Sequence, residues 1–305
     1  MLVFATSDKG GTGRSVTSCN MVYRYALRGE NACYVDFDFG SPTAGAVFAI
    51  EGVARGTEAG GVHEYLLGHI PEPDRLNIWD KSERESIRRR PDRAGELVLI
   101  PGDRGGGEFA ATPDIVDRCA DLLLRLEEQF SLTLVDLSAG RSYAAEIVLT
   151  VLARPEFAEV RSRWLIYHRW TRQHIIAAAG LLEGERGILH TGAELGHDER
   201  ALRESIRFVR TAVVDPESDE LSGLRAPQVA WLHECNSNLH KLASAEHIGQ
   251  ATTLGIVPLD PVLQWREQII TESDTHNRGI ANLATVRAFE GLADRIDSED
   301  AWVPL

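Results

Sequence analysis

SDKGGTGRSVTS, residues 7 to 18, is the stretch of this chain that decides the fold. A short apolar run, Leu2 to Ala5, precedes it and has the length of a buried strand. Cys19 to Leu27 follows it, with apolar residues at helical spacing. Strand, glycine-rich turn and helix, in this order, are the context that a phosphate-binding loop requires. One position departs from the motif, because Arg14 stands where a lysine is usual.

The residue types in this loop suit phosphate binding. Gly10, Gly11 and Gly13 allow successive backbone N–H groups to point at phosphate oxygens, and the following helix adds its positive end. Ser15 stands where a hydroxyl would bind magnesium, next to the position whose lysine normally reaches the terminal phosphates. Arg14 keeps that charge on a planar and bulkier group. Taken alone, the turn is also consistent with an ordinary strand-to-helix connection.

Short apolar runs alternate with helix-like segments along the chain. Besides residues 2–5, buried strands are predicted at 32–35, 97–100, 132–135, 164–167 and 229–232. Between them, residues 115–130 and 174–182 carry apolar side chains at helical spacing. This alternation predicts an α/β fold with a mostly parallel central sheet and helices on both faces.

Residues 1–305 are expected to form a single domain. Two stretches break the alternation, near 68–96 and near 183–227, and we expect them to be surface elaborations. The second contains a helix-like segment, Asp198 to Val213, and a turn-rich segment, Asp215 to Gly223.

The charge balance is strongly acidic. The chain has 32 lysines and arginines against 46 aspartates and glutamates, a net charge of -14, which opposes a general polyanion-binding surface. DNA binding therefore has no support from the net charge and stays open only as a local contact. The arginines between Arg84 and Arg93 form a basic island that is either a solvated surface or a contact for a partner.

Cysteine usage and the start of the chain indicate a cytoplasmic protein. The four cysteines are scattered without a CxxC pair, so neither a disulfide framework nor a zinc site is expected. The first predicted strand begins almost at Met1, so no export leader is expected. The apolar stretches are far shorter than the ~20 residues of a membrane helix, so no membrane segment is expected.

Acidic residues follow two of the predicted strands. Asp36 and Asp38 come at the end of one, and Asp136 at the end of another. Ligands of parallel sheets bind beyond the carboxyl ends of the strands, so these carboxylates and the glycine loop are expected to converge. There a carboxylate can hold magnesium through water or position an attacking water. Any one of these aspartates also suits a helix cap or a turn.

At this point the sequence resembles the ParA/MinD family of deviant phosphate-loop ATPases. The resemblance rests on four segments in the family's order: KGGTGRS (9–15), DFD (36–38), LVDLSAG (134–140) and GIVPLD (255–260). It implies ATP and Mg2+ as cofactors and a homodimer that closes around nucleotide. It also implies an unidentified partner protein that the dimer recruits or positions.

The resemblance also implies roles for individual residues. Lys9 would reach the phosphates of the partner subunit, Asp38 would support attack by water, and Asp136 would lie near the metal. Ser15, Asp38 and Asp136 would hold magnesium, and Asp36 would be structural. The nucleotide itself would be held by Gly10, Gly11, Thr12, Gly13, Arg14, Ser15, Val16, Pro258 and Asp260, the last two beside the adenine.

Three features depart from the family pattern. Arg14 replaces the second lysine, so any hydrolysis is expected to be slow. His233 and Glu234 stand at the end of the predicted strand 229–232, where the family often has an asparagine near the base. The tail, 292–305, is acidic rather than basic and amphipathic, which disfavours membrane attachment.

Three functions follow, and the first is favoured. It is an ATP-binding, dimerising switch with slow ATPase activity that recruits or positions a partner. The second is a nucleotide-binding scaffold with little or no hydrolysis. The third is an ATP-coupled metabolic enzyme of the same fold group, which the scattered histidines and cysteines do not support.

Overall fold

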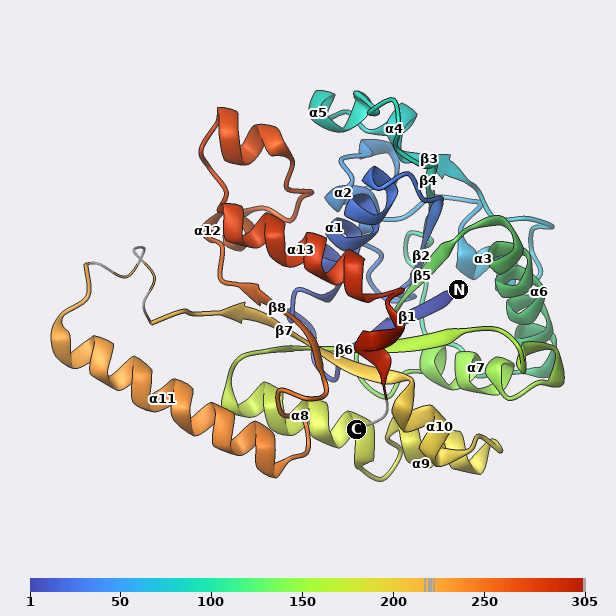
Figure 1. The fold of residues 1–305 in the computed structure, drawn as a ribbon. Coiled ribbons are helices and arrows are strands. Elements are labelled where there is room, and N and C mark those ends of the chain that lie inside the picture. Colours follow the sequence, from blue (N-terminus) through green and yellow to red (C-terminus); the bar gives the residue numbers. More distant parts are fainter. Residues whose placement is uncertain (217, 219–220, 222, 304–305) are drawn as a thin grey trace.

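One sheet of eight strands organises the chain. The computed structural model describes residues 1–216, 218, 221 and 223–303. The strands lie in the order β3-β4-β2-β5-β1-β6-β7-β8 (Figure 1). Their bounds are β1 Leu2–Thr6, β2 Ala32–Phe37, β3 Leu76–Asn77, β4 Leu97–Ile100, β5 Leu132–Leu137, β6 Ser162–Arg169, β7 Ile206–Val213 and β8 Thr253–Pro258. Only β3 runs antiparallel to its neighbour, and the other pairs are parallel.

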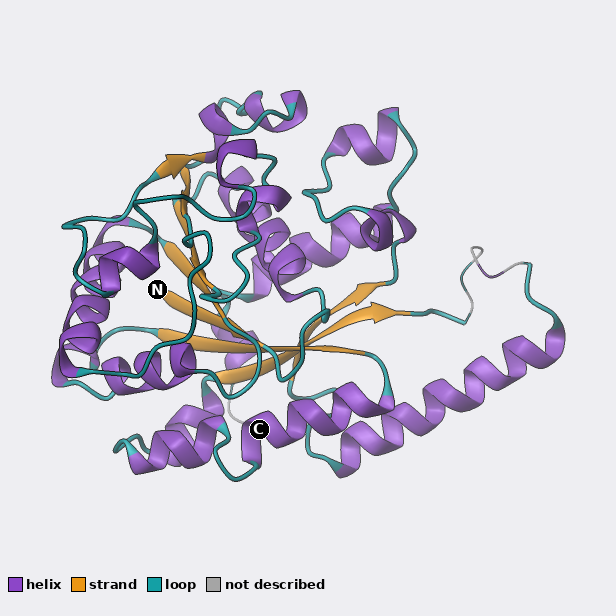
Figure 2. Ribbon diagram, turned by 180° about the vertical axis from the view of Figure 1, so that it is seen from behind, coloured by secondary structure: helices purple, strands orange, loops and turns teal. Residues whose placement is uncertain are grey.

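Helices cover both faces of this sheet, as Figure 2 shows. One face packs against α3 Val62–Leu66, α6 Pro113–Gln129, α7 Tyr143–Leu152, α8 Arg172–Glu183, α9 Ile188–Glu194 and α10 Glu199–Glu204. The other packs against α1 Arg14–Leu27, α2 Ala44–Val47, α4 Ile78–Lys81, α5 Glu85–Arg88, α12 Pro261–Trp265 and α13 Leu283–Arg295. The remaining described elements are α11 Ala226–Ala245, a π-helical segment at Ser273–Asn277, and short 3-10 helices at Glu51–Val53, Pro155–Phe157 and Glu299–Trp302.

The strands are buried on both sides because both of their faces carry apolar side chains. In β1, Leu2 and Phe4 lie in the core beneath α6 and α7, whereas Val3 and Ala5 lie in the core beneath α1 and α13. This alternation follows from the two-residue repeat of a strand. The predicted α/β class is confirmed, and the strands predicted at 2–5, 32–35, 97–100, 132–135 and 164–167 all lie in the sheet.

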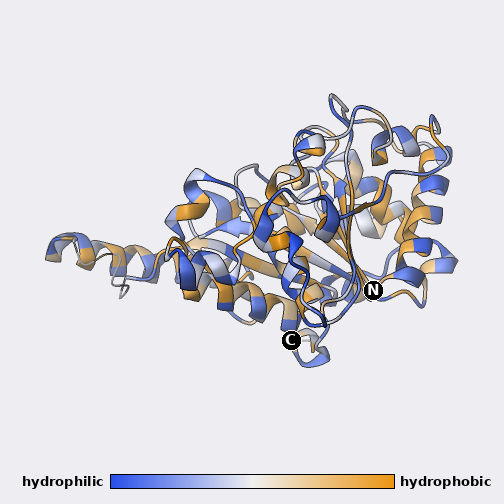
Figure 3. Cartoon of the chain, turned by 90° about the horizontal axis from the view of Figure 1, so that it is seen from above, coloured by the Kyte–Doolittle hydropathy of each residue, from blue (hydrophilic) through white to orange (hydrophobic). Residues whose placement is uncertain are grey.

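The strand predicted at 229–232 is wrong. These residues belong to α11, a helix that extends beyond the body of the molecule (Figures 1 and 3). The less exposed residues of this helix include Val229, Leu232, Leu239 and Leu242, at spacings of three, seven and three residues. The apolar run 229–232 is therefore part of an apolar stripe along a helix. Four residues are too few to distinguish the helical period from a strand, which is why the prediction failed.

His233 and Glu234 accordingly lie on an exposed stretch of α11 and not at the end of a strand. The helix begins after Arg225, with Pro227 in its first turn, where a missing N–H costs no helical hydrogen bond. It is held to the body where the Trp170 indole donates to Asn236 Oδ1 at 2.8 Å.

Residues 206–213 form β7 instead of continuing a helix. The helix-like segment predicted from Asp198 to Val213 is right for α10 but wrong from Ile206 onward. The region 183–227 therefore contributes a strand to the central sheet, between β6 and β8. The turn-rich segment predicted at 215–223 lies partly outside the described residues.

The other irregular region, 68–96, forms the β3 edge and two short helices (Figure 1). Arg84 donates to the Ile269 carbonyl and pairs with the buried Asp274, so this arginine holds two chain segments together. Arg88 and Arg89, from the basic island between Arg84 and Arg93, are exposed, which agrees with a solvated surface. No helix among the described residues is both long and apolar enough to cross a bilayer.

Candidate functional site

The glycine loop lies at the carboxyl end of β1, and α1 begins directly after it. Gly11 and Gly13 have φ values of 71° and 76°, in the left-handed region that side chains with a Cβ rarely adopt. Gly13 caps α1, and its carbonyl accepts the first helical hydrogen bond from the Thr17 N–H at 2.9 Å. The sequence of small residues thus lets the chain turn sharply from strand into helix.

Contacts from β5 and β7, on either side of β1 in the sheet, fix the position of the loop. The Gly140 N–H, after β5, donates to the Ser7 carbonyl at 2.7 Å. The Thr211 hydroxyl, on β7, donates to the Thr12 carbonyl. Both contacts use carbonyl groups of the loop as acceptors, so neither of them occupies an N–H group of the loop.

The loop borders a hollow of about 240 Å³. Its lining consists of Ser7, residues 10–16, Asp38, Ser41, Thr43, Val47, Ala139 and Glu267. The predicted residues Gly10, Gly11, Thr12, Gly13, Arg14, Ser15, Val16 and Asp38 are therefore brought together at one cavity. Asp136 lies directly behind it, as a partner of Arg14.

The Arg14 side chain turns back from the loop onto the strand-end acids. It is only 6% exposed, and its Nε donates to Asp136 Oδ1. One terminal nitrogen donates to Asp38 Oδ2 at 3.0 Å, and the other donates to the Ser7 hydroxyl at 3.3 Å. Burial alone would lower the pKa of Arg14, but the charges of Asp136 and Asp38 outweigh it and raise that pKa. The guanidinium is therefore a fixed positive charge in the site.

Asp36, beside Asp136 in the register of β2 and β5, accepts from backbone N–H groups and supports the chain after β2. Its carboxylate accepts the Ala44 N–H at 3.0 Å and the Asp38 N–H at 3.4 Å. Burial, reinforced by the negative charge of Asp136, raises the pKa of Asp36 to about 8. This carboxyl is thus largely protonated at neutral pH, which agrees with a structural role.

The contacts of the remaining two acids bear on the magnesium site implied by the resemblance. Asp136 Oδ2 accepts the Tyr34 hydroxyl at 2.6 Å, and Asp38 Oδ1 accepts the Ser41 N–H at 3.1 Å. With the Arg14 contacts, every oxygen of both carboxylates accepts a hydrogen bond from the protein. Mg2+ needs such oxygens turned toward it or toward its waters. The described residues include no group of three or more His, Cys, Asp or Glu placed to hold a metal. Because both carboxylates pair with Arg14, this arrangement does not fit a magnesium ion held by Asp38 and Asp136.

Pro258 and Asp260 line a second hollow, of about 170 Å³, which adjoins the first and shares Gly11, Thr12, Gly13 and Val16 with it. Asp260 is buried, and its carboxylate caps α12 through the Val262 N–H at 3.1 Å. It also accepts the Asn282 N–H and the Thr285 hydroxyl. Its side chain therefore builds the wall of this hollow.

Lys9 is exposed and lines neither hollow of its own subunit. Its carbonyl accepts the Ser7 hydroxyl at 3.0 Å, which shapes the start of the loop. Whether Lys9 reaches the phosphates of a second subunit and Asp38 supports attack by water, as the resemblance implies, stays a prediction.

Some lining residues were not predicted from the sequence. Glu267 borders both hollows, and Arg169, at the end of β6, lines the second. Arg169 follows a predicted strand, so its place at the strand end was a usable signal. Glu267 lies in an irregular segment after α12, and only the tertiary fold brings it to the loop.

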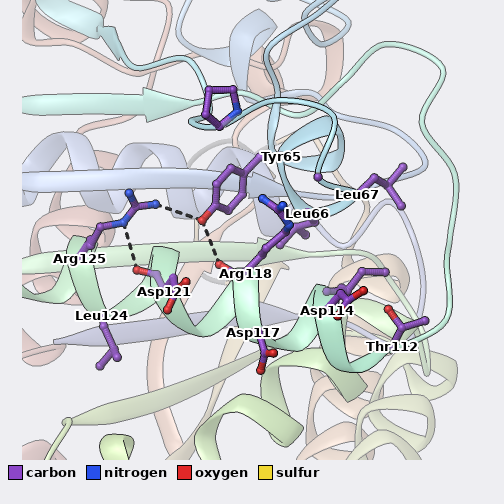
Figure 4. Close-up of a pocket in the computed structure, with 13 residues that line it drawn as sticks. Tyr65, Leu66, Leu67, Thr112, Asp114, Asp117, Arg118, Asp121, Leu124 and Arg125 are labelled. Carbon is purple, nitrogen blue, oxygen red and sulfur yellow. Dashed lines mark hydrogen bonds between the residues drawn. The ribbon is translucent and has the colours of Figure 1, made fainter.

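A larger hollow, of about 990 Å³, lies between α3 and α6 (Figure 4). The Tyr65 hydroxyl donates to the Arg118 carbonyl at 3.2 Å and accepts from Arg125 at 3.1 Å. None of the glycine-loop residues line it. It therefore lies apart from the candidate site at the glycine loop.

Comparison with solved structures reveals similar folds along almost the whole chain. A MinD septum site-determining protein from Pyrococcus horikoshii, complexed with Mg-ADP, has 13% identity and a TM-score of 0.55, with 98% of each chain covered. A ParA family ATPase from Chlorobium tepidum also has 13% identity and a TM-score of 0.55, covering 97% of this chain and 98% of that one. A plasmid partition protein from Borrelia burgdorferi, bound to AMPPNP, has 12% identity and a TM-score of 0.57, with 96% of each chain covered.

No family model and no curated protein matches the sequence.

Proposed function

We propose that this chain, which has the fold of the ParA and MinD ATPases, is an ATP-binding, dimerising switch with slow hydrolysis that recruits or positions a partner protein. One observation carries the proposal. The glycine loop, the start of α1 and the strand-end acid Asp38 meet around one hollow at the carboxyl edge of the sheet, and Asp136 pairs with Arg14 behind it. Such an edge is where ligands of parallel sheets bind.

The loop is suited to the phosphates. The backbone N–H groups of residues 10–15 and the positive end of α1 would hold phosphate oxygens. The adjoining hollow would take the base, because Val257, Pro258 and Leu263 give it apolar walls.

Dimerisation would complete the site. Lys9 is exposed and lines neither hollow of its own subunit, so its ammonium is available to a second subunit. A charge delivered to the terminal phosphate by the other copy couples association to the phosphate state. Loss of that phosphate would then weaken the dimer and release the partner.

Slow hydrolysis is expected because both carboxylate oxygens of Asp38 already accept hydrogen bonds from the protein, which hinders Asp38 from positioning an attacking water. One of its oxygens accepts from Arg14 and the other from the Ser41 N–H. The same contacts favour a second candidate function, a scaffold that binds nucleotide with little or no hydrolysis. A measured turnover decides between the two.

The test combines calorimetry with ADP, ATP and a slowly hydrolysed analogue, light scattering for mass, and phosphate release. The parent should bind ATP and double its mass with the analogue. Lys9→Ala should keep nucleotide binding and lose the mass increase, whereas Lys241→Ala, an exposed lysine on α11, should behave as the parent. An absence of nucleotide binding overturns the proposal, and a dimer unaffected by Lys9→Ala overturns the role of Lys9.

A further inference from the structure

Arg14 and the two strand-end acids form a largely buried set of charges beside the proposed nucleotide site. The guanidinium is 6% exposed and Asp136 is 1% exposed, while Asp38 is 19% exposed toward the hollow. The single positive charge contacts both carboxylates. The arginine therefore neutralises part of the negative charge that a bound cation would otherwise offset.

The guanidinium still has donors to offer. It carries five N–H groups, and three of them are used by Asp136, Ser7 and Asp38. One N–H remains on each terminal nitrogen, and Arg14 itself lines the 240 Å³ hollow. An arginine in this position can contact carboxylates on one side and phosphate oxygens on the other.

We infer that Arg14 takes the place of the divalent cation in this site, so that the chain binds nucleotide without magnesium. The inference rests on the proposed nucleotide site. It assigns Arg14 two tasks that a metal and a lysine would share: compensating Asp38 and Asp136, and binding the phosphates. It also explains why all four carboxylate oxygens already accept protein donors.

A lysine at position 14 could not perform both tasks. Its ammonium is a compact charge with three donors, whereas the planar guanidinium spreads five donors over three nitrogens. Arg14→Lys should thus free at least one carboxylate and open the site to a metal. Arg141→Lys is the matched control, because Arg141 lies near the same sheet edge but outside the lining of the hollow.

The experiment measures ADP binding by calorimetry in excess EDTA and in excess Mg2+, with the full chain. For the parent and Arg141→Lys, the dissociation constants in the two buffers should agree within about twofold. For Arg14→Lys, the dissociation constant in EDTA should be at least about tenfold higher than in Mg2+. A tenfold change corresponds to the free energy of about one charge-assisted hydrogen bond. Electron paramagnetic resonance with Mn2+ and ADP should detect protein-bound manganese only in Arg14→Lys.

The outcomes separate this inference from the function on which it rests. If the parent binds ADP only with Mg2+, and holds Mn2+ with it, the inference is overturned while the nucleotide site stands. If the parent binds no nucleotide in either buffer, both fail. If Arg14→Lys does not fold, the parent's two dissociation constants and its manganese spectrum still decide the question.

Discussion

Removal of the Arg14 guanidinium should destabilise the protein strongly, even in the absence of nucleotide. Arg14→Met keeps an unbranched apolar stem and deletes the charge. Asp136, which is 1% exposed, then stays buried without its cation, and breaking a buried pair in this way costs about 3–5 kcal/mol. Asp38 is 19% exposed and partly solvated, so its share should stay below about 1 kcal/mol. We therefore expect the free energy of unfolding to fall by about 3–5 kcal/mol.

Urea unfolding at pH 7, followed by tryptophan fluorescence, measures this loss. Arg104→Met is the control, because Arg104 pairs with Glu58 at 3.0 Å on the exposed surface, where such pairs contribute under about 1 kcal/mol. Adding Asp136→Asn to Arg14→Met should restore part of the stability, since the buried charge is then gone while the Tyr34 hydroxyl keeps an acceptor. A loss below about 1 kcal/mol for Arg14→Met would refute the view that the guanidinium compensates a buried carboxylate.

Three further predictions concern the loop, Asp36 and Asp260. Gly13→Ala should cost about 1 kcal/mol of stability, because its φ of 76° disfavours a Cβ. Gly10→Ala, where φ is not left-handed and a Cβ meets nothing within 4 Å, should cost much less in the same urea assay. The pKa of Asp36 is raised in the folded chain from 3.8 to about 8. The parent's free energy of unfolding should therefore fall as pH rises between these values. Between about pH 5 and pH 8, Asp36→Asn should lose less of its free energy of unfolding than the parent does. Asp260→Ala should lower the urea midpoint, since two part-buried N–H donors and the buried Thr285 hydroxyl lose this acceptor, and an unchanged midpoint would contradict that structural role.

Much of the fold follows from local patterns in the sequence. Five strands are visible as short apolar runs, and helices α1, α6 and α8 are visible because their apolar residues recur at helical spacing. The glycine loop is visible for a similar reason, since Gly11 and Gly13 are needed where the backbone enters the left-handed region. These features depend on neighbours in the chain alone.

Strand β7 shows where local patterns fail. Two arginines interrupt its apolar residues, and both are buried. Arg210 stacks on Trp170 at 4.2 Å and donates to the Ile248 carbonyl, while Arg207 stacks on Trp302 at 5.1 Å and donates to the Val303 carbonyl. Their partners come from distant segments of the chain, so the sequence alone shows only charges that normally stay in water.

The same division runs through the candidate site. The sequence by itself determined that a glycine loop, an arginine in the lysine position and three strand-end aspartates would meet at one edge of a parallel sheet, because strand direction and the loop's small residues dictate that convergence. Only the tertiary structure decided how the charges are shared. Asp36 turns to backbone donors and keeps its proton, whereas Asp38 and Asp136 both accept from Arg14. The reason is that burial and the distances between side chains remote in sequence set the energy of each ion, and no local pattern contains them.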